Sequence, residues 1–212
     1  GQVDRVTQMI DDGWAGKNDH SAVPVAGFPK GMTALAFAAY NGHRDVVQAL
    51  LTRGAEVNDR SPLVLAASGG YTDVVQLLLG AGARVDAFCG ISAAHCRGML
   101  GANALQAASG GGHPATVHAL LDAGANPLIS DMFGATAVIK ATHTRDTSKA
   151  QYDFTGDLAA QDLHLRAVEV LKILKRIIQV AYPSAIAYKD RKKGQWRSYD
   201  ELRVLRHRRR RR

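Results

Sequence analysis

A pattern that recurs three times in the same order constrains this chain more than any other feature. Each copy has an alanine-rich stretch, a glycine turn, a stretch of paired Val and Leu residues, and a final Gly-Ala. The copies begin at Thr33, Ser61 and Asn103, and the residues ten positions later are His43, Tyr71 and His113. A unit that recurs at this spacing predicts stacked supersecondary elements rather than one central core.

The residue types within each copy explain how such units stack. Paired alanines let neighbouring helices approach closely, and glycines supply the left-handed backbone that ends a helix. A single unit cannot bury both faces of its Leu pairs, so each unit buries its leucines against the next unit. The alanine pairs are Ala38–Ala39, Ala66–Ala67 and Ala107–Ala108, and the turn glycines are Gly42, Gly70, Gly112, Gly54, Gly82 and Gly124.

This pattern resembles the ankyrin repeat, whose units read roughly T-P-L-H-x-A-A, then G-H, V-V, L-L-L and G-A. The resemblance covers about residues 3 to 180. It implies an all-α solenoid of stacked helix-turn-helix units with irregular finger loops, followed here by a basic C-terminal tail. The Thr or Ser that opens a unit is expected to cap its first helix, and His43 and His113 are expected to form structural hydrogen bonds beside the turns.

The spacing of the units predicts how the chain is divided. A fourth unit starts at Thr136, and the four starts lie 28, 42 and 33 residues apart. The ordinary period is about 33, so the first connection is short and the second long. The last unit carries a polar insertion, predicted to be a loop, before a second helix at His164–Gln179. We expect a partial first repeat with a connecting loop at 1–30, repeats at 31–60, 61–100 and 101–133, a degenerate repeat at 134–182 with an insertion at about 143–163, and a basic tail at 183–212 with a short helix near 199–206.

The positive charge of the chain is concentrated in that tail. Residues 191–212 hold 11 of the 27 Lys and Arg residues but two of the 19 acids, whereas residues 1–190 have a net charge of −1. An Arg-rich run beside a Trp suits nucleic acid, lipid or a nuclear-import receptor, and a tail without a selected role is the alternative. The candidate polyanion-binding residues are Lys192, Lys193, Arg197, Arg208, Arg209 and Arg210.

No catalytic or cofactor motif is found in the sequence. The glycine run Gly110–Gly112 lacks the Lys-Ser/Thr of a phosphate-binding loop. Cys89 and Cys96 are seven residues apart, which does not match a zinc clip. We therefore favour ordinary loop cysteines in a reducing compartment over zinc or a redox pair. The sequence predicts no enzyme, cofactor, metal or membrane span, and it favours a cytoplasmic or nuclear location.

The resemblance implies a non-catalytic protein-interaction module or scaffold that binds a protein partner through its finger loops and first-helix face. The alternatives are a nucleic-acid or nuclear-import accessory that acts through the tail, or the targeting fragment of a larger enzyme. Apolar loop residues are the favoured contacts, because a desolvated anchor contributes about 2 kcal/mol or more to binding. The candidate residues are Tyr40, Asn41, Arg60, Ser68, Phe88, Ile91, Arg97, Met99, Met132 and Phe133.

Overall fold

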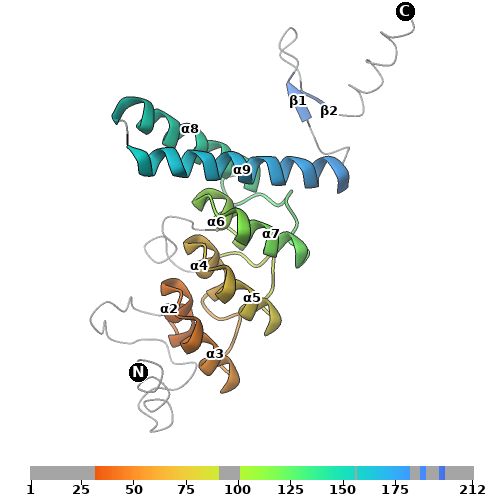
Figure 1. Cartoon of the computed structure of the whole chain (residues 1–212). Helices are drawn as coiled ribbons and strands as arrows, with labels where there is room; N and C mark the ends of the chain where they lie inside the picture. Colours follow the sequence, from red (N-terminus) through yellow and green to blue (C-terminus); the bar gives the residue numbers. More distant parts are fainter. Residues whose placement is uncertain (1–31, 91–100, 156, 182–186, 190–195, 199–212) are drawn as a thin grey trace, which may run out of the picture.

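The computed structural model describes residues 32–90, 101–155, 157–181, 187–189 and 196–198. Figure 1 shows helices stacked in pairs along the chain. The helices are α2 (Ala34–Asn41), α3 (Arg44–Thr52), α4 (Pro62–Gly69), α5 (Thr72–Gly80), α6 (Ala104–Gly111), α7 (Pro114–Asp122), α8 (Ala137–Thr155) and α9 (Leu158–Ala181). The predicted all-α repeat fold is confirmed.

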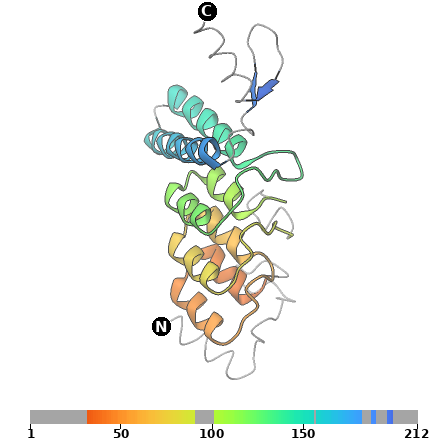
Figure 2. The ribbon, with the colours of Figure 1, turned by 90° about the vertical axis from the view of Figure 1, so that its right-hand side faces the viewer.

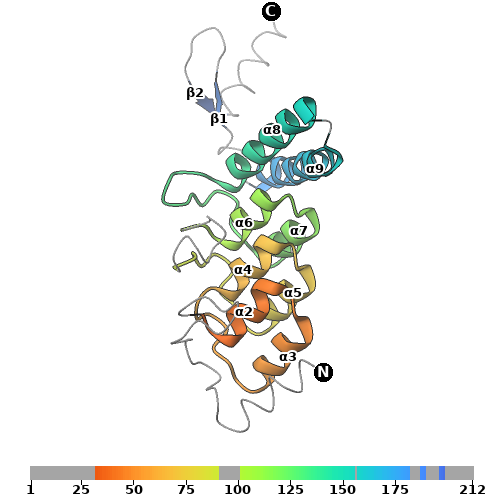
Figure 3. The same ribbon diagram turned by 90° about the vertical axis from the view of Figure 1, so that its left-hand side faces the viewer.

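The pairs form two layers. The first helices of the pairs contact one another in sequence, α2 with α4, α4 with α6 and α6 with α8, and the second helices do the same from α3 to α9. Figure 3 shows both layers, with the connecting loops projecting from the side of the first helices. Contacts therefore run from each pair to the next, as expected for a solenoid.

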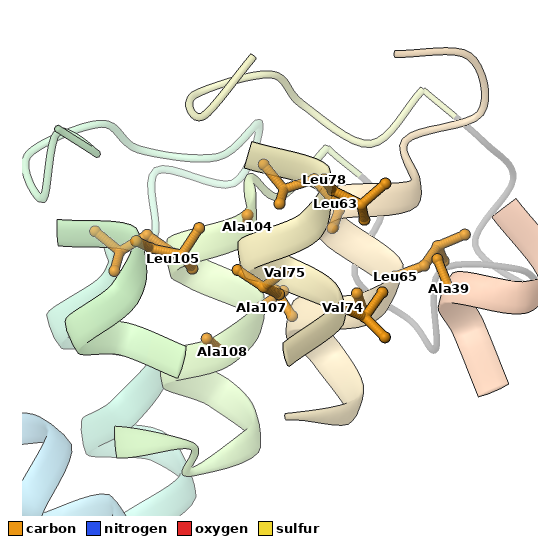
Figure 4. Packing of buried hydrophobic residues seen from close by; sticks show 14 of the residues in the cluster. Ala39, Leu63, Leu65, Val74, Val75, Leu78, Ala104, Leu105, Ala107 and Ala108 are labelled. Carbon is orange, nitrogen blue, oxygen red and sulfur yellow. The ribbon is translucent and has the colours of Figure 1, made fainter. Parts of the chain in front are cut away.

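The core follows the repeat pattern. One leucine from each second helix is fully buried, namely Leu50, Leu78, Leu120 and Leu174. Figure 4 shows Leu65 of α4 beside Ala39 of α2, where the small side chain leaves room for the large one. Both residues are completely buried, so the alanine pairs act as predicted and let adjacent repeats pack closely.

The helix ends confirm one of the two Thr or Ser caps predicted at the start of α2 and α4. Thr33 Oγ1 accepts from the N–H of Ala36 at 3.1 Å, and Pro62 occupies the first turn of α4. Ser61 departs from the prediction, because it is left-handed (φ 54°) and makes no cap hydrogen bond. Its hydroxyl instead donates to the carbonyl of Phe88 at 3.3 Å. Helix α4, which follows the short first connection, therefore has no side-chain cap.

The turn glycines provide contact sites for the following repeat. Gly42 (φ 72°) and Gly70 (φ 73°) are left-handed, as predicted. A Cβ on Gly42 would lie 2.5 Å from the Tyr71 ring, and one on Gly70 would lie 2.5 Å from the His113 ring. His113 Nε2 also lies 3.2 Å from the carbonyl oxygen of Ser68, which confirms its structural role. His43 is exposed, and no hydrogen bond of its ring is found among the described residues.

The prediction that the insertion forms a polar loop is wrong. Residues 137–155 form the continuous helix α8, and α9 begins at Leu158 rather than His164. The hydroxyl groups of this segment bond back to their own helix, with Thr142 donating to Val138 O at 2.8 Å and Ser148 to Thr144 O at 2.6 Å. Because the polar side chains are satisfied locally, the segment extends the helix instead of interrupting it.

The chain after α9 contains the described strands. β1 (Ala187–Lys189) pairs antiparallel with β2 (Trp196–Ser198), in a tail where only a helix was predicted. That helix, near 199–206, lies outside the described residues. Among the helices that the structure describes, none has the length and apolar character needed to cross a membrane.

Candidate functional site

The candidate site is built from the connections between repeats, which we call finger 1 (residues 53–61), finger 2 (81–103, of which 91–100 are not described) and finger 3 (123–136). All three project from the same side of the stack (Figure 2). This position follows from the repeat, because each finger leaves the end of a second helix and returns to the start of the next first helix.

Finger 1 is short and conformationally unusual. Arg60 (φ 56°) and Ser61 (φ 54°) are both left-handed without being glycine, a conformation that costs about 1 kcal/mol or more per residue. Asn58 connects this finger to the next one, since its Oδ1 accepts from the N–H of Arg84 at 2.8 Å. The strain is therefore confined to the two residues that close the shortened connection.

Finger 2 has a short antiparallel base. Phe88 pairs with Asn103, and the N–H of Cys89 donates to the carbonyl of Ala102 at 2.8 Å. Cys89 is buried and disulfide-bonded, so the expectation of an ordinary loop thiol is wrong there. The other cysteine of the chain, Cys96, lies outside the described residues.

Finger 3 turns around a buried carboxylate. Oδ1 of Asp131 accepts from the N–H of Phe133 at 2.9 Å and from that of Ala135 at 2.8 Å. Its Oδ2 lies 2.8 Å from Nζ of Lys140 on α8. The Asp131 side chain is fully buried and that of Lys140 is 29% exposed, so the ion pair holds the turn onto the last repeat.

These contacts also set the charge state of the turn. Burial alone would raise the pKa of Asp131, but the hydrogen bond from Lys140 and those from the Ala135 and Phe133 N–H groups outweigh burial and lower the pKa below its usual value. Asp131 is therefore ionised at neutral pH. The finger loses this support when the carboxylate is protonated in acid.

A buried glutamine on α6 binds both sides of the turn in finger 3. Nε2 of Gln106 donates to the carbonyl of Ile129 at 2.8 Å and to that of Ala135 at 3.0 Å. Its Oε1 accepts from the N–H of Asn103 at 2.9 Å, completing the reciprocal cap of α6. The sequence reasoning missed this role. The available signal was the amide at the position where the aligned units have Ala36 and Val64, which have no polar side chain.

An open apolar cavity lies between fingers 2 and 3. Its volume is about 460 Å³, and it is lined by Phe88, Cys89, Gly101, Ser130, Asp131 and Met132. Met132 lies over Gly101, where an added Cβ would be 3.0 Å from its sulfur. Four large apolar side chains on these fingers stay accessible, with Phe88 48%, Met132 66%, Phe133 76% and Leu128 36% exposed.

The predicted contact residues divide into four groups. Phe88, Met132 and Phe133 gather on fingers 2 and 3, as just described. Ser68 is 6% exposed, and its hydroxyl donates to Leu65 O at 2.8 Å, so it belongs to the packing of the stack. Ile91, Arg97 and Met99 lie outside the described residues.

The first-helix candidates are partly accessible. Tyr40, Asn41 and Arg60 are half-buried. The Asn41 amide donates to Phe37 O at 2.9 Å within α2, and the Arg60 guanidinium lies 3.9 Å from the Asp59 carboxylate. Tyr40 and Asn41 lie at the C-terminal end of α2, which leads into the turn to α3.

The basic-tail candidates are largely beyond the described part of the chain. Arg197 falls within β2, and only its backbone is described. The remaining five, Lys192, Lys193, Arg208, Arg209 and Arg210, lie outside the described residues. Their predicted contact with a polyanion stays a prediction.

The site offers surface contacts. No group of three or more His, Cys, Asp or Glu side chains that could hold a metal ion is found in the part of the chain that the structure describes. The Asp131 carboxylate is engaged in the turn of finger 3 and in the ion pair with Lys140, while Phe88, Met132 and Phe133 on fingers 2 and 3 are exposed and apolar. Such an arrangement is suited to recognition of another surface.

Comparison with known families agrees with the geometry. A model described as Ankyrin repeats (3 copies) matches residues 1–89, and one described as Ankyrin repeat matches residues 100–132. No curated protein matches the chain. Ankyrin repeats are generally protein–protein interaction modules and typically non-catalytic. Paired helices in two layers, fingers on one side and these two matches together show that the chain belongs to the ankyrin repeat family.

Proposed function

We propose that the chain binds a protein partner through fingers 2 and 3, with Phe88, Met132 and Phe133 as apolar anchors. The observation that carries the proposal is the exposure of these three side chains on loops whose backbones are held by internal hydrogen bonds. An ordered loop loses little conformational entropy when it binds. Exposed apolar side chains on such loops are suited to be the energetically dominant contacts.

The cavity beside the anchors supports the same proposal. It lies between the two fingers and is lined partly by Phe88 and Met132. A partner side chain that enters it would be removed from water on several sides, the environment typical of strong interface contacts. Tyr40 and Asn41 would then contact the flank of the same partner.

The test compares finger variants with matched exposed variants elsewhere. The double variant Met132→Ala and Phe133→Ala should bind the cross-linked partner about 30-fold or more weakly than the parent chain does. This corresponds to a loss of about 2 kcal/mol of binding free energy. Leu158→Ala with Leu165→Ala removes similarly exposed apolar side chains, 75% and 60% exposed, from α9. Partners are identified by cross-linking and mass spectrometry, and their affinities are measured by calorimetry.

The controls separate binding from stability. All variants should unfold at the temperature of the parent chain, because the altered side chains are exposed. Retention of the same partners at the same affinity by the finger variant would contradict the proposal. So would an equal loss of binding in the α9 variant.

A further inference from the structure

An exposed group of cations on α9 lies outside the finger site. Lys172, Lys175 and Arg176 are all exposed. Their spacing of three and four residues places them on one face of the helix, along about 6 Å of its axis. The neighbouring exposed residues toward the helix end are Gln179, which is polar, and Val180, which is apolar.

These cations differ from most others in the described stack in having no acidic partner there. Arg44 pairs with Asp45, Lys140 with Asp131, Arg145 with Asp146 and Arg166 with Asp162. The ion pairs of the described residues include none of the three cations on α9, although exposed Glu169 lies one turn earlier on the same helix. Their charge is therefore directed to solvent or to a ligand.

The helix dipole does not explain the cluster. Favourable interactions of cations with a helix C-terminus fall off within the last turn. The last turn of α9 contains no basic residue, and the helix ends at Ala181, five residues beyond Arg176. The cluster therefore requires a different explanation from helix stabilisation.

The charge continues along the sequence from this helix. Residues 182–212 contain 12 Lys and Arg residues and three Asp and Glu residues, whereas the first 190 residues are close to neutral. Figure 3 shows α9 on the opposite side of the stack from finger 3. A ligand on α9 would leave the fingers free for a protein partner.

We propose that Lys172, Lys175 and Arg176 form a binding surface for the phosphate backbone of a nucleic acid. Successive phosphates of one strand in duplex DNA lie about 3.4 Å apart along the axis, so three cations over about 6 Å of helix can face adjacent phosphates. A membrane-binding helix would combine its cations with large apolar or aromatic side chains on the inserted face. Here the large apolar side chains of Leu171, Leu174 and Ile178 are buried against the stack, and the exposed residues beside the cations are Ile177, Gln179 and Val180, none of them aromatic.

The test measures the salt dependence of binding with the full chain. The probe is a labelled single-stranded oligonucleotide of mixed sequence, and its affinity is measured by fluorescence anisotropy over a series of salt concentrations. The test variant combines Lys172→Gln, Lys175→Gln and Arg176→Gln. Each lost contact to a single strand lowers the slope of log affinity against log salt by about 0.7, so the slope should fall by about 2 and the affinity about 100-fold at 0.1 M salt.

A matched variant carries the same change of net charge elsewhere. This variant removes three exposed cations, one each from α3, finger 1 and finger 2, by Arg44→Gln, Arg53→Gln and Arg84→Gln. It should keep the parent slope. Circular dichroism should show parent-like folding for both, since Gln is a good helix former. The proposal would be overturned by an unchanged slope in the α9 variant or by an equal change in both variants. It would also be overturned if the parent chain bound phosphatidylserine vesicles but not the oligonucleotide.

Discussion

Replacement of Gln106 by Met tests whether one buried amide holds finger 3. Gln106 is 1% exposed, and Met has similar length and volume, so the cavity contribution is small. The change removes three hydrogen bonds, to the Asn103 N–H and to the carbonyls of Ile129 and Ala135. The Ala135 carbonyl still accepts from the Asp131 N–H at 3.0 Å.

The expected cost comes mainly from the two groups left without a partner, the Asn103 N–H and the Ile129 carbonyl. A buried polar group without a partner costs about 1–3 kcal/mol, so the free energy of unfolding should fall by about 3 kcal/mol. Urea denaturation followed by circular dichroism measures this change. Amide hydrogen exchange should also accelerate at residues 129–136, where the finger loses both of its tethers.

The matched control is Gln76→Met on α5. Gln76 is exposed, so the same substitution there should change stability by less than about 0.5 kcal/mol. A loss below about 1 kcal/mol for Gln106→Met, with unchanged exchange in finger 3, would refute the reasoning. It would show that turn geometry and the Asp131 contacts hold the loop without the amide.

Two further perturbations test the turn and the stacking. Asp131→Asn should destabilise the protein by about 1 kcal/mol at pH 7, because it removes the ion pair with Lys140. Since the folded pKa of Asp131 is lowered, this stabilisation is fully present above the unfolded pKa of about 4 and disappears as pH falls through the folded value; a difference between variant and parent that does not change with pH would contradict the assignment. Gly70→Ala should cost about 2–3 kcal/mol in urea denaturation, because it combines left-handed strain with a clash against the His113 ring. Gly82→Ala has similar strain (φ 88°) but no atom within 4 Å, so it should cost about 1 kcal/mol, and equal losses for the two variants would show that the ring contact contributes nothing.

The stacked fold was predictable because its determinants are local and repeated. Each unit is specified by Ala pairs, turn glycines and Leu pairs at fixed offsets. Because the units share this pattern, the packing surface of one unit fits that of the next. The polar insertion was misjudged for a physical reason. Thr and Ser are common in loops, but a helix also satisfies their hydroxyl groups when they donate to carbonyls four residues earlier.

The finger site was only partly predictable, because its support comes from contacts between residues far apart in sequence. The exposure of Met132 and Phe133 follows from their place in a connection between repeats. By contrast, the pairing of Asp131 with Lys140 and of Gln106 with Ile129 depends on how the connection packs against α8 and α6. The repeat pattern fixes where the finger begins and ends, but not its path.

The contrast between fingers 1 and 3 shows why the supporting contacts matter for recognition. Finger 1 closes its short connection with two strained residues, Arg60 and Ser61, and has no equivalent of Gln106, because the first helix of the same repeat has Ala36 at that position. Finger 3 has an amide and a carboxylate within its base and presents its apolar residues at the tip. The buried polar groups therefore allow apolar side chains to stay exposed on an ordered loop, since a loop without them would lower its energy by folding Met132 and Phe133 against the stack.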